Sequence, residues 1–196
     1  MKLLLASGSA TRRQMLERAG VSFEVVAATA DEEAEKRRLI AAEKSPAEIA
    51  LSLAELKARS VVEPHGLVLG SDQVLEQEDG TMLSKPGSRK EAREQLSALA
   101  GRRHQLHAAV VLVEQGEVSW RSVETVGMKM RPLSEAYVDA YLGAEFDSVR
   151  HNVGCYRIEG LGAQLFEKVE GSHFAVLGLP LLPLLTELRR RGMLAS

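Results

Sequence analysis

Apolar runs and polar turns alternate along the chain, and their lengths separate strands from helices. Short apolar runs bounded by glycine or polar turns are typical of buried strands. Runs of this kind predict strands over residues 3–6, 66–70 and 165–169, and Val74 and Leu75 prolong the second of them beyond Ser71-Asp72-Gln73. Two longer strands are predicted over 105–113 and 118–130, joined at a Gln115-Gly116 turn.

Helix starts are marked by a capping pattern, in which a serine or threonine precedes a glutamate or glutamine by three residues. Three segments match it: Thr11–Gln14, Ser45–Glu48 and Ser88–Glu91. Glycines are natural helix stops, so we expect the first of these helices to end near Gly20 and the third at Gly101. In the second, Ile49, Leu53 and Leu56 lie at helical spacing, with Lys57 beside Leu56. Ser134 is expected to cap a helix ending near Leu142, before Gly143, and a last helix is expected over 181–191. Interleaved strands and helices with hairpins predict an α/β fold with a mixed twisted sheet and flanking helices.

Composition narrows the classes of partner. The chain has 196 residues, with 25 basic and 27 acidic side chains and a formal net charge of −2. A balanced charge and 4% aromatic residues disfavour nucleic-acid binding, so an anionic ligand would need a local basic cluster. The length suits one domain, or two small lobes around a shared sheet.

Cys155 is the only cysteine, which excludes an intramolecular disulfide. The N-terminal apolar run is too short for a signal peptide, and the most apolar stretch, 177–185, contains two prolines and is too short to span a membrane. We therefore expect a cytoplasmic protein with no membrane partner.

The first candidate site is the loop that enters the first helix. Ser7, Ser9, Arg12 and Arg13 lie where backbone N–H groups and the positive end of a helix dipole favour an anion. Hydroxyl and guanidinium groups there would hold phosphate oxygens. The alternative is that Thr11 only caps the helix and both arginines are solvated.

Three further side chains are candidates by position. Asp72 is expected just past a strand end, where a carboxylate can bind Mg²⁺ and activate water. Lys85 precedes the rigid Pro86, and Lys57 sits at the edge of a buried helical stripe. Glu32 belongs to an acidic triplet that either supplies a metal ligand or is a solvated face. Taken singly, each of these residues also fits an ordinary structural role.

Together these segments resemble the Maf family of nucleoside triphosphate pyrophosphatases over nearly the whole chain. The resemblance is carried by short motifs in the family's order: Leu5–Arg13, Ala54–Ala58, Gly70–Val74, Ser84–Pro86, Gly154–Gly162 and Val176–Pro180. It implies one Maf-like domain over residues 1–196, with the elongated two-lobed fold of inosine triphosphate pyrophosphatases around a central cleft.

The resemblance also implies an enzyme, a divalent metal (Mg²⁺ or Mn²⁺) and a homodimer. The reaction is hydrolysis of the α–β phosphate bond of a nucleoside triphosphate to the monophosphate and pyrophosphate. On matching positions, Asp72 is the proton acceptor and a metal ligand, with Glu32 a weaker candidate for the metal. The triphosphate is bound by the family's cationic positions, Arg12, Arg13, Lys57 and Lys85.

Residues Gln73 and Glu159 resemble the 7-methyl-GTP pyrophosphatase branch of the family. A glutamate can accept two hydrogen bonds from guanine, whereas the dTTP/UTP branch tends to have threonine and glutamine at these places. Thr11 departs from the branch, which often has a tryptophan there that could stack on a methylated base. The resemblance leaves two alternatives: a dTTP/UTP pyrophosphatase, and a nucleotide-binding regulator of septum formation with incidental catalysis.

Overall fold

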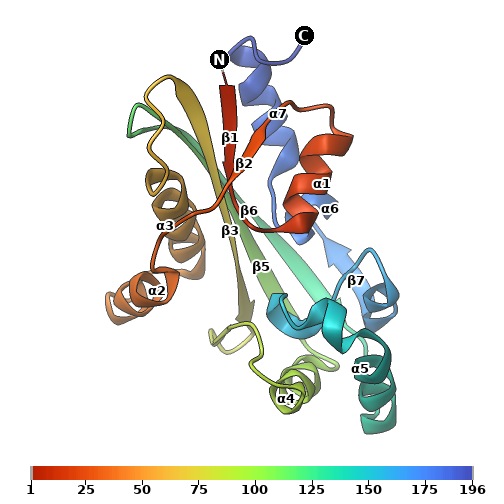
Figure 1. Ribbon diagram of the computed structural model, residues 1–196. Coiled ribbons are helices and arrows are strands. Elements are labelled where there is room, and N and C mark those ends of the chain that lie inside the picture. Colours follow the sequence, from red (N-terminus) through yellow and green to blue (C-terminus); the bar gives the residue numbers. More distant parts are fainter. Residues whose placement is uncertain (1, 196) are drawn as a thin grey trace. The chain divides into compact units, whose positions relative to one another are not determined.

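The computed structural model describes residues 2–195 as a mixed α/β protein (Figure 1). Its strands are β1 (Lys2–Ala6), β2 (Glu24–Val26), β3 (Gly66–Gln77), β4 (Met82–Leu83), β5 (Arg103–Glu114), β6 (Glu117–Met130) and β7 (Phe166–Glu170). Its helices are α1 (Ala10–Arg18), α2 (Glu32–Ala41), α3 (Pro46–Arg59), α4 (Arg89–Leu99), α5 (Glu135–Val149), α6 (His173–Val176) and α7 (Leu181–Arg190), with 3₁₀ turns at Val153–Cys155 and Leu161–Leu165.

The strands form one sheet in the order β2-β1-β3-β5-β6-β7, with β4 paired to β3. Strand β1 runs parallel to β2 and β3, while β4 and β7 run antiparallel to β3 and β6. The sheet is therefore mixed, as the sequence predicts. In the part of the chain that the structure describes, no helix has the length and apolar character needed to cross a membrane.

The chain divides into two compact units. The first comprises residues 1–73, 107–124 and 172–196, and the second comprises 74–106 and 125–171. Strands β3, β5 and β6 contribute residues to both units. The prediction of one Maf-like domain with two lobes around a cleft stays a prediction.

In the first unit, helices lie on both faces of the sheet (Figure 1). Alternate residues of β1, β3 and β5 point to the face covered by α1 and α7, where they form an apolar core. Trp120 packs against this core, so the sole tryptophan has a structural place there, as expected. The core residues are Leu3, Leu5, Met15, Leu16, Val21, Leu67, Leu69, Val110, Leu112, Leu179, Leu181, Leu184 and Leu188.

The opposite face of β3 is covered by α3, and a glycine permits their close approach. A Cβ atom at Gly70 would lie 2.0 Å from the carbonyl oxygen of Ala54 and 2.8 Å from the backbone nitrogen of Ala58. No side chain fits in that space. Gly70 thus sets the distance between β3 and the helix that carries Lys57.

The second unit contains a buried polar and aromatic cluster. His104 Nε2 lies 2.9 Å from the Tyr156 hydroxyl, and the ring of Tyr156 meets that of Phe166 edge-on at 4.7 Å. Burial lowers the pKa of His104 to about 4 and raises that of Cys155 to about 12. Both groups are therefore neutral near neutral pH.

Three local predictions are wrong. Ser9, not Thr11, caps α1, because the Ser9 hydroxyl accepts the Arg12 N–H. Asp72 lies inside β3 rather than past its end, since β3 extends to Gln77. Helix α5 runs through Gly143 to Val149, which is fully buried; an interior glycine costs only about 1 kcal/mol, which such burial offsets.

The remaining element predictions are confirmed within a few residues. Ser45 and Glu48 form the expected capping box, and β5 and β6 are joined through Gln115 and Gly116. Ser88 caps α4 as expected, although the Glu91 carboxylate accepts from the N–H of Gly87 rather than from that of Ser88. The short elements β2, α2 and α6 were not predicted.

Candidate functional site

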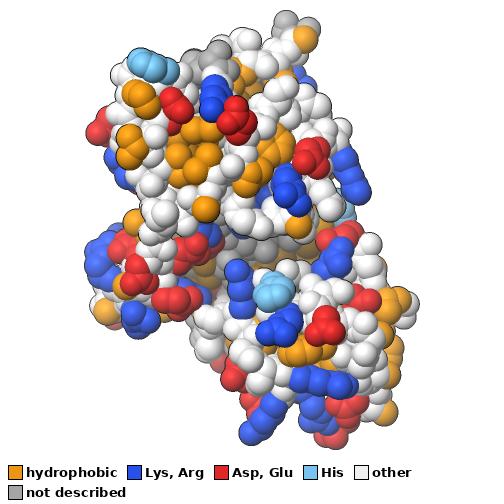
Figure 2. Space-filling model, in the orientation of Figure 1, with side chains coloured by type: hydrophobic (Ala, Val, Ile, Leu, Met, Phe, Trp, Pro, Cys, Tyr) orange, Lys and Arg blue, Asp and Glu red, His pale blue; other side chains and the backbone are white. Residues whose placement is uncertain are grey.

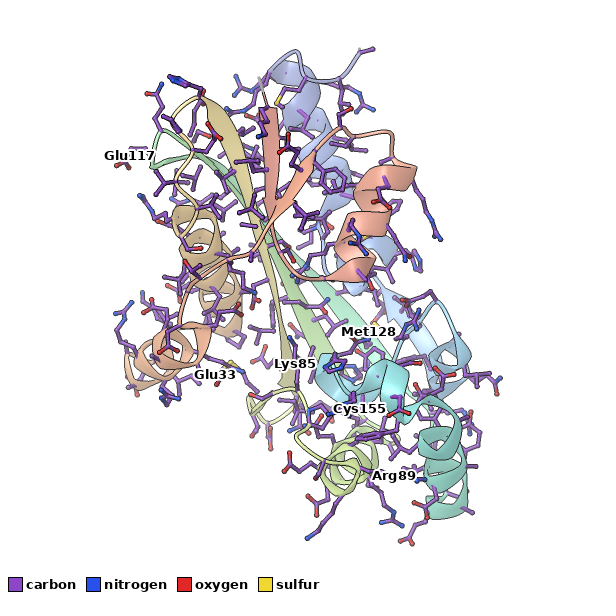
Figure 3. All side chains as sticks on the ribbon, in the orientation of Figure 1. Glu33, Lys85, Arg89, Glu117, Met128 and Cys155 are labelled. Atoms are coloured by element: carbon purple, nitrogen blue, oxygen red, sulfur yellow. The ribbon has the colours of Figure 1, made fainter. Side chains whose placement is uncertain are left out.

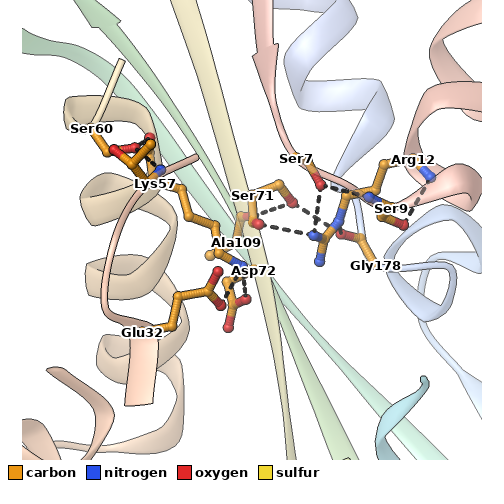
Figure 4. A network of polar contacts seen from close by, with 11 residues as sticks. Ser7, Ser9, Arg12, Glu32, Lys57, Ser60, Ser71, Asp72, Ala109 and Gly178 are labelled. Carbon is orange, nitrogen blue, oxygen red and sulfur yellow. Dashed lines mark hydrogen bonds and ion pairs between the residues drawn. The ribbon is translucent and has the colours of Figure 1, made fainter. Parts of the chain in front are cut away.

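Alternation along β3 sends neighbouring side chains to opposite faces of the sheet. Asp72 points to the side of α3, whereas Ser71 points to the loop that follows α6 (Figure 4). Two groups of polar contacts therefore flank one strand, and both lie within the first unit.

On the α3 side, one ammonium group joins two carboxylates. Lys57 Nζ donates to Asp72 Oδ1 at 2.6 Å and lies 2.9 Å from Glu32 Oε2. The Lys57 and Asp72 side chains are only 10% and 14% exposed, and that of Glu32 is 43% exposed. The structure thus brings together three of the residues predicted for the site.

The helices place these side chains through identifiable contacts. Lys57 belongs to the buried stripe of α3 rather than lying at its edge, since it is only 8% exposed. The Ser60 hydroxyl donates to the Lys57 carbonyl at 2.8 Å and accepts the N–H of Thr29 at 3.2 Å. This contact ties the segment that leads to Glu32 onto the end of α3.

Arg12 lies on the other side of β3, buried among backbone acceptors. Its Nε donates to the Gly178 carbonyl at 2.8 Å, and its Nη1 donates to the Ser71 carbonyl at 2.9 Å and to the Ser7 hydroxyl at 3.4 Å. Burial lowers the pKa of Arg12, while the charges of Asp72 and Glu32 raise it; an arginine nevertheless stays protonated in proteins.

The residues predicted to bind phosphate in the loop before α1 differ in how far they are exposed to water. The Ser7 hydroxyl accepts the N–H of Ser9 at 3.3 Å and is buried. Ser9 caps α1, and Thr11 is half-buried. Arg13 is exposed, with its Nε 4.0 Å from Glu17. Of the two predicted arginines, Arg13 is thus the one that faces water.

Gln73 is held by the end of α6. Its amide nitrogen donates to the carbonyls of Ala175 at 2.8 Å and Val176 at 3.1 Å. Because both partners are acceptors, the amide nitrogen must face them and the Gln73 oxygen must face away. Toward a ligand, the Gln73 side chain can therefore only accept a hydrogen bond, through its oxygen.

Two predicted residues belong to the second unit. Lys85, which is labelled in Figure 3, is exposed, and the following Pro86 is buried. Glu159 accepts a hydrogen bond from Arg157 Nε at 3.2 Å. A Cβ atom at Gly162 would lie 2.4 Å from the Arg157 carbonyl oxygen, so this glycine allows the loop to close on itself. The roles of Lys85 and Glu159 stay predictions.

Asp72 and Glu32, which share the Lys57 ammonium group, are the two carboxylates that would hold a divalent ion at this site. Among residues 2–195 there is no group of three or more histidine, cysteine or acidic side chains arranged to hold a metal. Mg²⁺ is commonly bound by one or two carboxylates together with substrate phosphates. A pair of carboxylates already gathered around one cationic group fits that mode of binding.

Charged side chains of both signs are interspersed on the face shown in Figure 2, in keeping with the small net charge.

The sequence motifs gave no role to three residues that contact predicted site residues: Ser71, Gly178 and Arg157. Gly178 has a φ of +93°, and a Cβ atom there would lie 3.3 Å from Arg12 Nη2. The glycine in the Val176–Pro180 motif was the one available signal for this contact.

Comparison with known proteins agrees with the sequence motifs. The family model described as Maf-like protein matches residues 2–191. The chain is 45% identical to a nucleoside triphosphate pyrophosphatase of Sphingopyxis alaskensis over 98% of both chains. It is 47% identical to a 7-methyl-GTP pyrophosphatase of Rhizobium meliloti, over 97% of this chain and 96% of that protein.

A third relative, a nucleoside triphosphate pyrophosphatase of Nitrobacter hamburgensis, is 48% identical over 98% of this chain and 95% of its own. All of these matches extend along nearly the full chain, so they include every motif on which the resemblance depends. The chain therefore belongs to the Maf family.

Proposed function

We propose that this protein is a metal-dependent nucleoside triphosphate pyrophosphatase, which converts a nucleoside triphosphate and water to the monophosphate and pyrophosphate. The observation that carries the proposal is the contact of Lys57 with Asp72 and Glu32 in the first unit. Carboxylates can hold a divalent ion and orient an attacking water, and an ammonium group can stabilise charge on phosphate oxygens. The names of the relatives support the same activity.

Asp72 is the proposed general base. Its side chain is 14% exposed, so water can reach the carboxylate while most of the solvent is excluded. It accepts a proton from the attacking water as the new P–O bond forms, and pyrophosphate leaves as the α–β bridge bond breaks. A positioned base contributes about 10²–10⁴-fold to a rate.

Asp72 and Glu32 would also hold the divalent ion. When bound, such an ion neutralises negative charge that develops on the phosphate oxygens. Carboxylate oxygens suit Mg²⁺ and Mn²⁺. The need for a metal is part of the proposal, as are a cytoplasmic location and a homodimer.

The cationic side chains divide into two kinds. Arg13 and Lys85 are exposed and free to reach a phosphate. Arg12 uses Nε and Nη1 on protein acceptors, so a contact with the triphosphate would be made through Nη2. Ser7 and Ser9 complete the proposed phosphate loop.

For the base, we propose a guanine-type nucleotide such as 7-methyl-GTP. Gln73 offers only its oxygen, and Glu159 offers a carboxylate, so both accept hydrogen bonds. Guanine can donate hydrogen bonds from both its ring N–H and its amino group, whereas uracil and thymine have no such pair of donors. The 7-methyl-GTP pyrophosphatase of Rhizobium meliloti supports this choice, and a dTTP/UTP preference is the alternative.

The test is release of pyrophosphate from 7-methyl-GTP, GTP, dTTP, UTP and CTP with Mg²⁺ or Mn²⁺. We expect turnover, with the guanine-type nucleotides ranked first. Preference for dTTP or UTP would overturn the base assignment alone. Nucleotide binding without pyrophosphate release would instead favour a nucleotide-binding regulator of cell division.

A further inference from the structure

Lys57 holds the carboxylates that the proposed function gives to a metal. Its ammonium group lies 2.6 Å from Asp72 Oδ1 and 2.9 Å from Glu32 Oε2 (Figure 4). The same ammonium group is also the proposed ligand of a phosphate. In this arrangement the ammonium group lies where a metal ion shared by the two carboxylates would be bound. It therefore excludes the metal ion and is not available to a phosphate.

Charge favours keeping a cation at this position. Two carboxylates close to one another repel, and the repulsion is stronger when water is excluded. With the side chains of Lys57 and Asp72 only 10% and 14% exposed, solvent can do little to separate them. A positive group between Asp72 and Glu32 reduces this repulsion in the free protein, and the Lys57 ammonium group supplies one such charge.

The ammonium group is carried on a longer side chain than either carboxylate, so it is the group that can move furthest. Asp72 lies within the long strand β3, and Glu32 begins α2, next to the N-cap Asp31. The Ser60 contacts with Thr29 and with the Lys57 carbonyl hold the backbone of this region. A lysine side chain, by contrast, carries its charge on a flexible four-carbon stem.

Resting on the proposed function, we infer that Lys57 occupies the metal position in the free protein and exchanges its carboxylate partners for phosphate oxygens when metal and nucleotide bind. The exchange leaves each of these groups next to a group of opposite charge. Asp72 and Glu32 pass from an ammonium group to a divalent ion, and the ammonium group passes to the polyanionic triphosphate. Metal and nucleotide then bind cooperatively, and the free protein binds metal weakly.

The test is Mn²⁺ binding to the protein without nucleotide, followed by electron paramagnetic resonance of the free ion at pH 8. Lys57→Met removes the competing charge at nearly constant length and should bind Mn²⁺ at least about tenfold more tightly than wild type. Lys57→Arg keeps the charge and should bind as weakly as wild type. Lys57→Gln is a second neutral variant, in case Lys57→Met does not fold.

Lys44→Met is the matched control. It removes the same charge just before α3, where Lys44 pairs with the exposed Glu48 at 2.9 Å. We expect its Mn²⁺ affinity to equal that of wild type. Tryptophan fluorescence from Trp120, which packs on the core of the first unit, checks that each variant is folded.

Neutral Lys57 variants that are folded and bind Mn²⁺ no more tightly than wild type overturn the inference, even if wild type releases pyrophosphate from GTP. Equal tightening in Lys44→Met also overturns it, because the effect would then be one of overall charge. Wild-type protein that releases no pyrophosphate overturns the proposed function, and this result is read in a separate assay.

Discussion

The two adjacent arginines of α1 should differ sharply when each is replaced by alanine. Arg12 is 9% exposed and donates to the carbonyls of Gly178 and Ser71 at 2.8 and 2.9 Å. Arg13 has a half-exposed side chain and approaches Glu17 only to 4.0 Å. We predict that Arg12→Ala destabilises the first unit and that Arg13→Ala lowers only activity.

The magnitude follows from the acceptors left behind. A hydrogen bond from a charged donor contributes about 1.5–3 kcal/mol, and Arg12→Ala removes two of good length. The Ser71 hydroxyl lies 3.0 Å from the Gly178 carbonyl, but its single proton is shared with the nearer Ala109 carbonyl at 2.7 Å, so it offsets the loss only in part. The guanidinium also no longer has to be buried. We therefore expect a loss of about 2–4 kcal/mol in the free energy of unfolding. An exposed pair such as Arg13–Glu17 contributes about 0–1 kcal/mol.

Urea denaturation followed by Trp120 fluorescence measures this difference. Trp120 packs on the core of the first unit, so its signal reports the unit that contains Arg12. Variants whose unfolding free energies differ by less than about 0.5 kcal/mol would refute the assignment of Arg12 to the packing of this region.

Three further predictions concern a helix contact, a buried histidine and the base. Gly70→Ala places a Cβ atom 2.0 Å from the Ala54 carbonyl oxygen. It should lower the free energy of unfolding by about 1–3 kcal/mol and lower kcat by moving Lys57. The control Gly8→Ala, with open space around it, should leave thermal stability unchanged. Burial lowers the pKa of His104 from 6.5 to about 4, so the unfolded chain binds a proton first as pH falls. This contribution to stability is fully present above about pH 6.5 and is lost toward pH 4, by roughly 3 kcal/mol in all. A pH series of urea midpoints should therefore flatten in His104→Gln but not in the exposed His151→Gln. Glu159→Gln should lower kcat/KM for guanine-type nucleotides by about 5–150-fold, the equivalent of 1–3 kcal/mol, and an unchanged substrate ranking would show that Glu159 does not contact the base.

Local chemistry made much of the fold predictable. The Ser45 capping box and the Gln115-Gly116 turn depend on neighbouring residues, so both appear where the sequence places them. The cap of α1 was misassigned because Ser9 and Thr11 are both good caps. Hydroxyl geometry, which sequence does not show, decides in favour of Ser9.

Long-range contacts set the limit of prediction for the site. Motif resemblance selected Lys57 and Asp72, and the structure places them 2.6 Å apart. The close approach of α3 that makes this contact possible depends on Gly70, which reads in the sequence as an ordinary strand end. The burial of Arg12 depends on Gly178, which is 166 residues away along the chain, and no local pattern predicts such a pairing.

The most direct test of the account is the identity of the products formed from GTP or 7-methyl-GTP with Mg²⁺, read by phosphorus NMR for wild type and Asp72→Asn. We predict equal amounts of monophosphate and pyrophosphate from wild type, and a rate about 10²–10⁴-fold lower from a folded Asp72→Asn protein. Release of inorganic phosphate with a nucleoside diphosphate, or near wild-type turnover by Asp72→Asn, would contradict it.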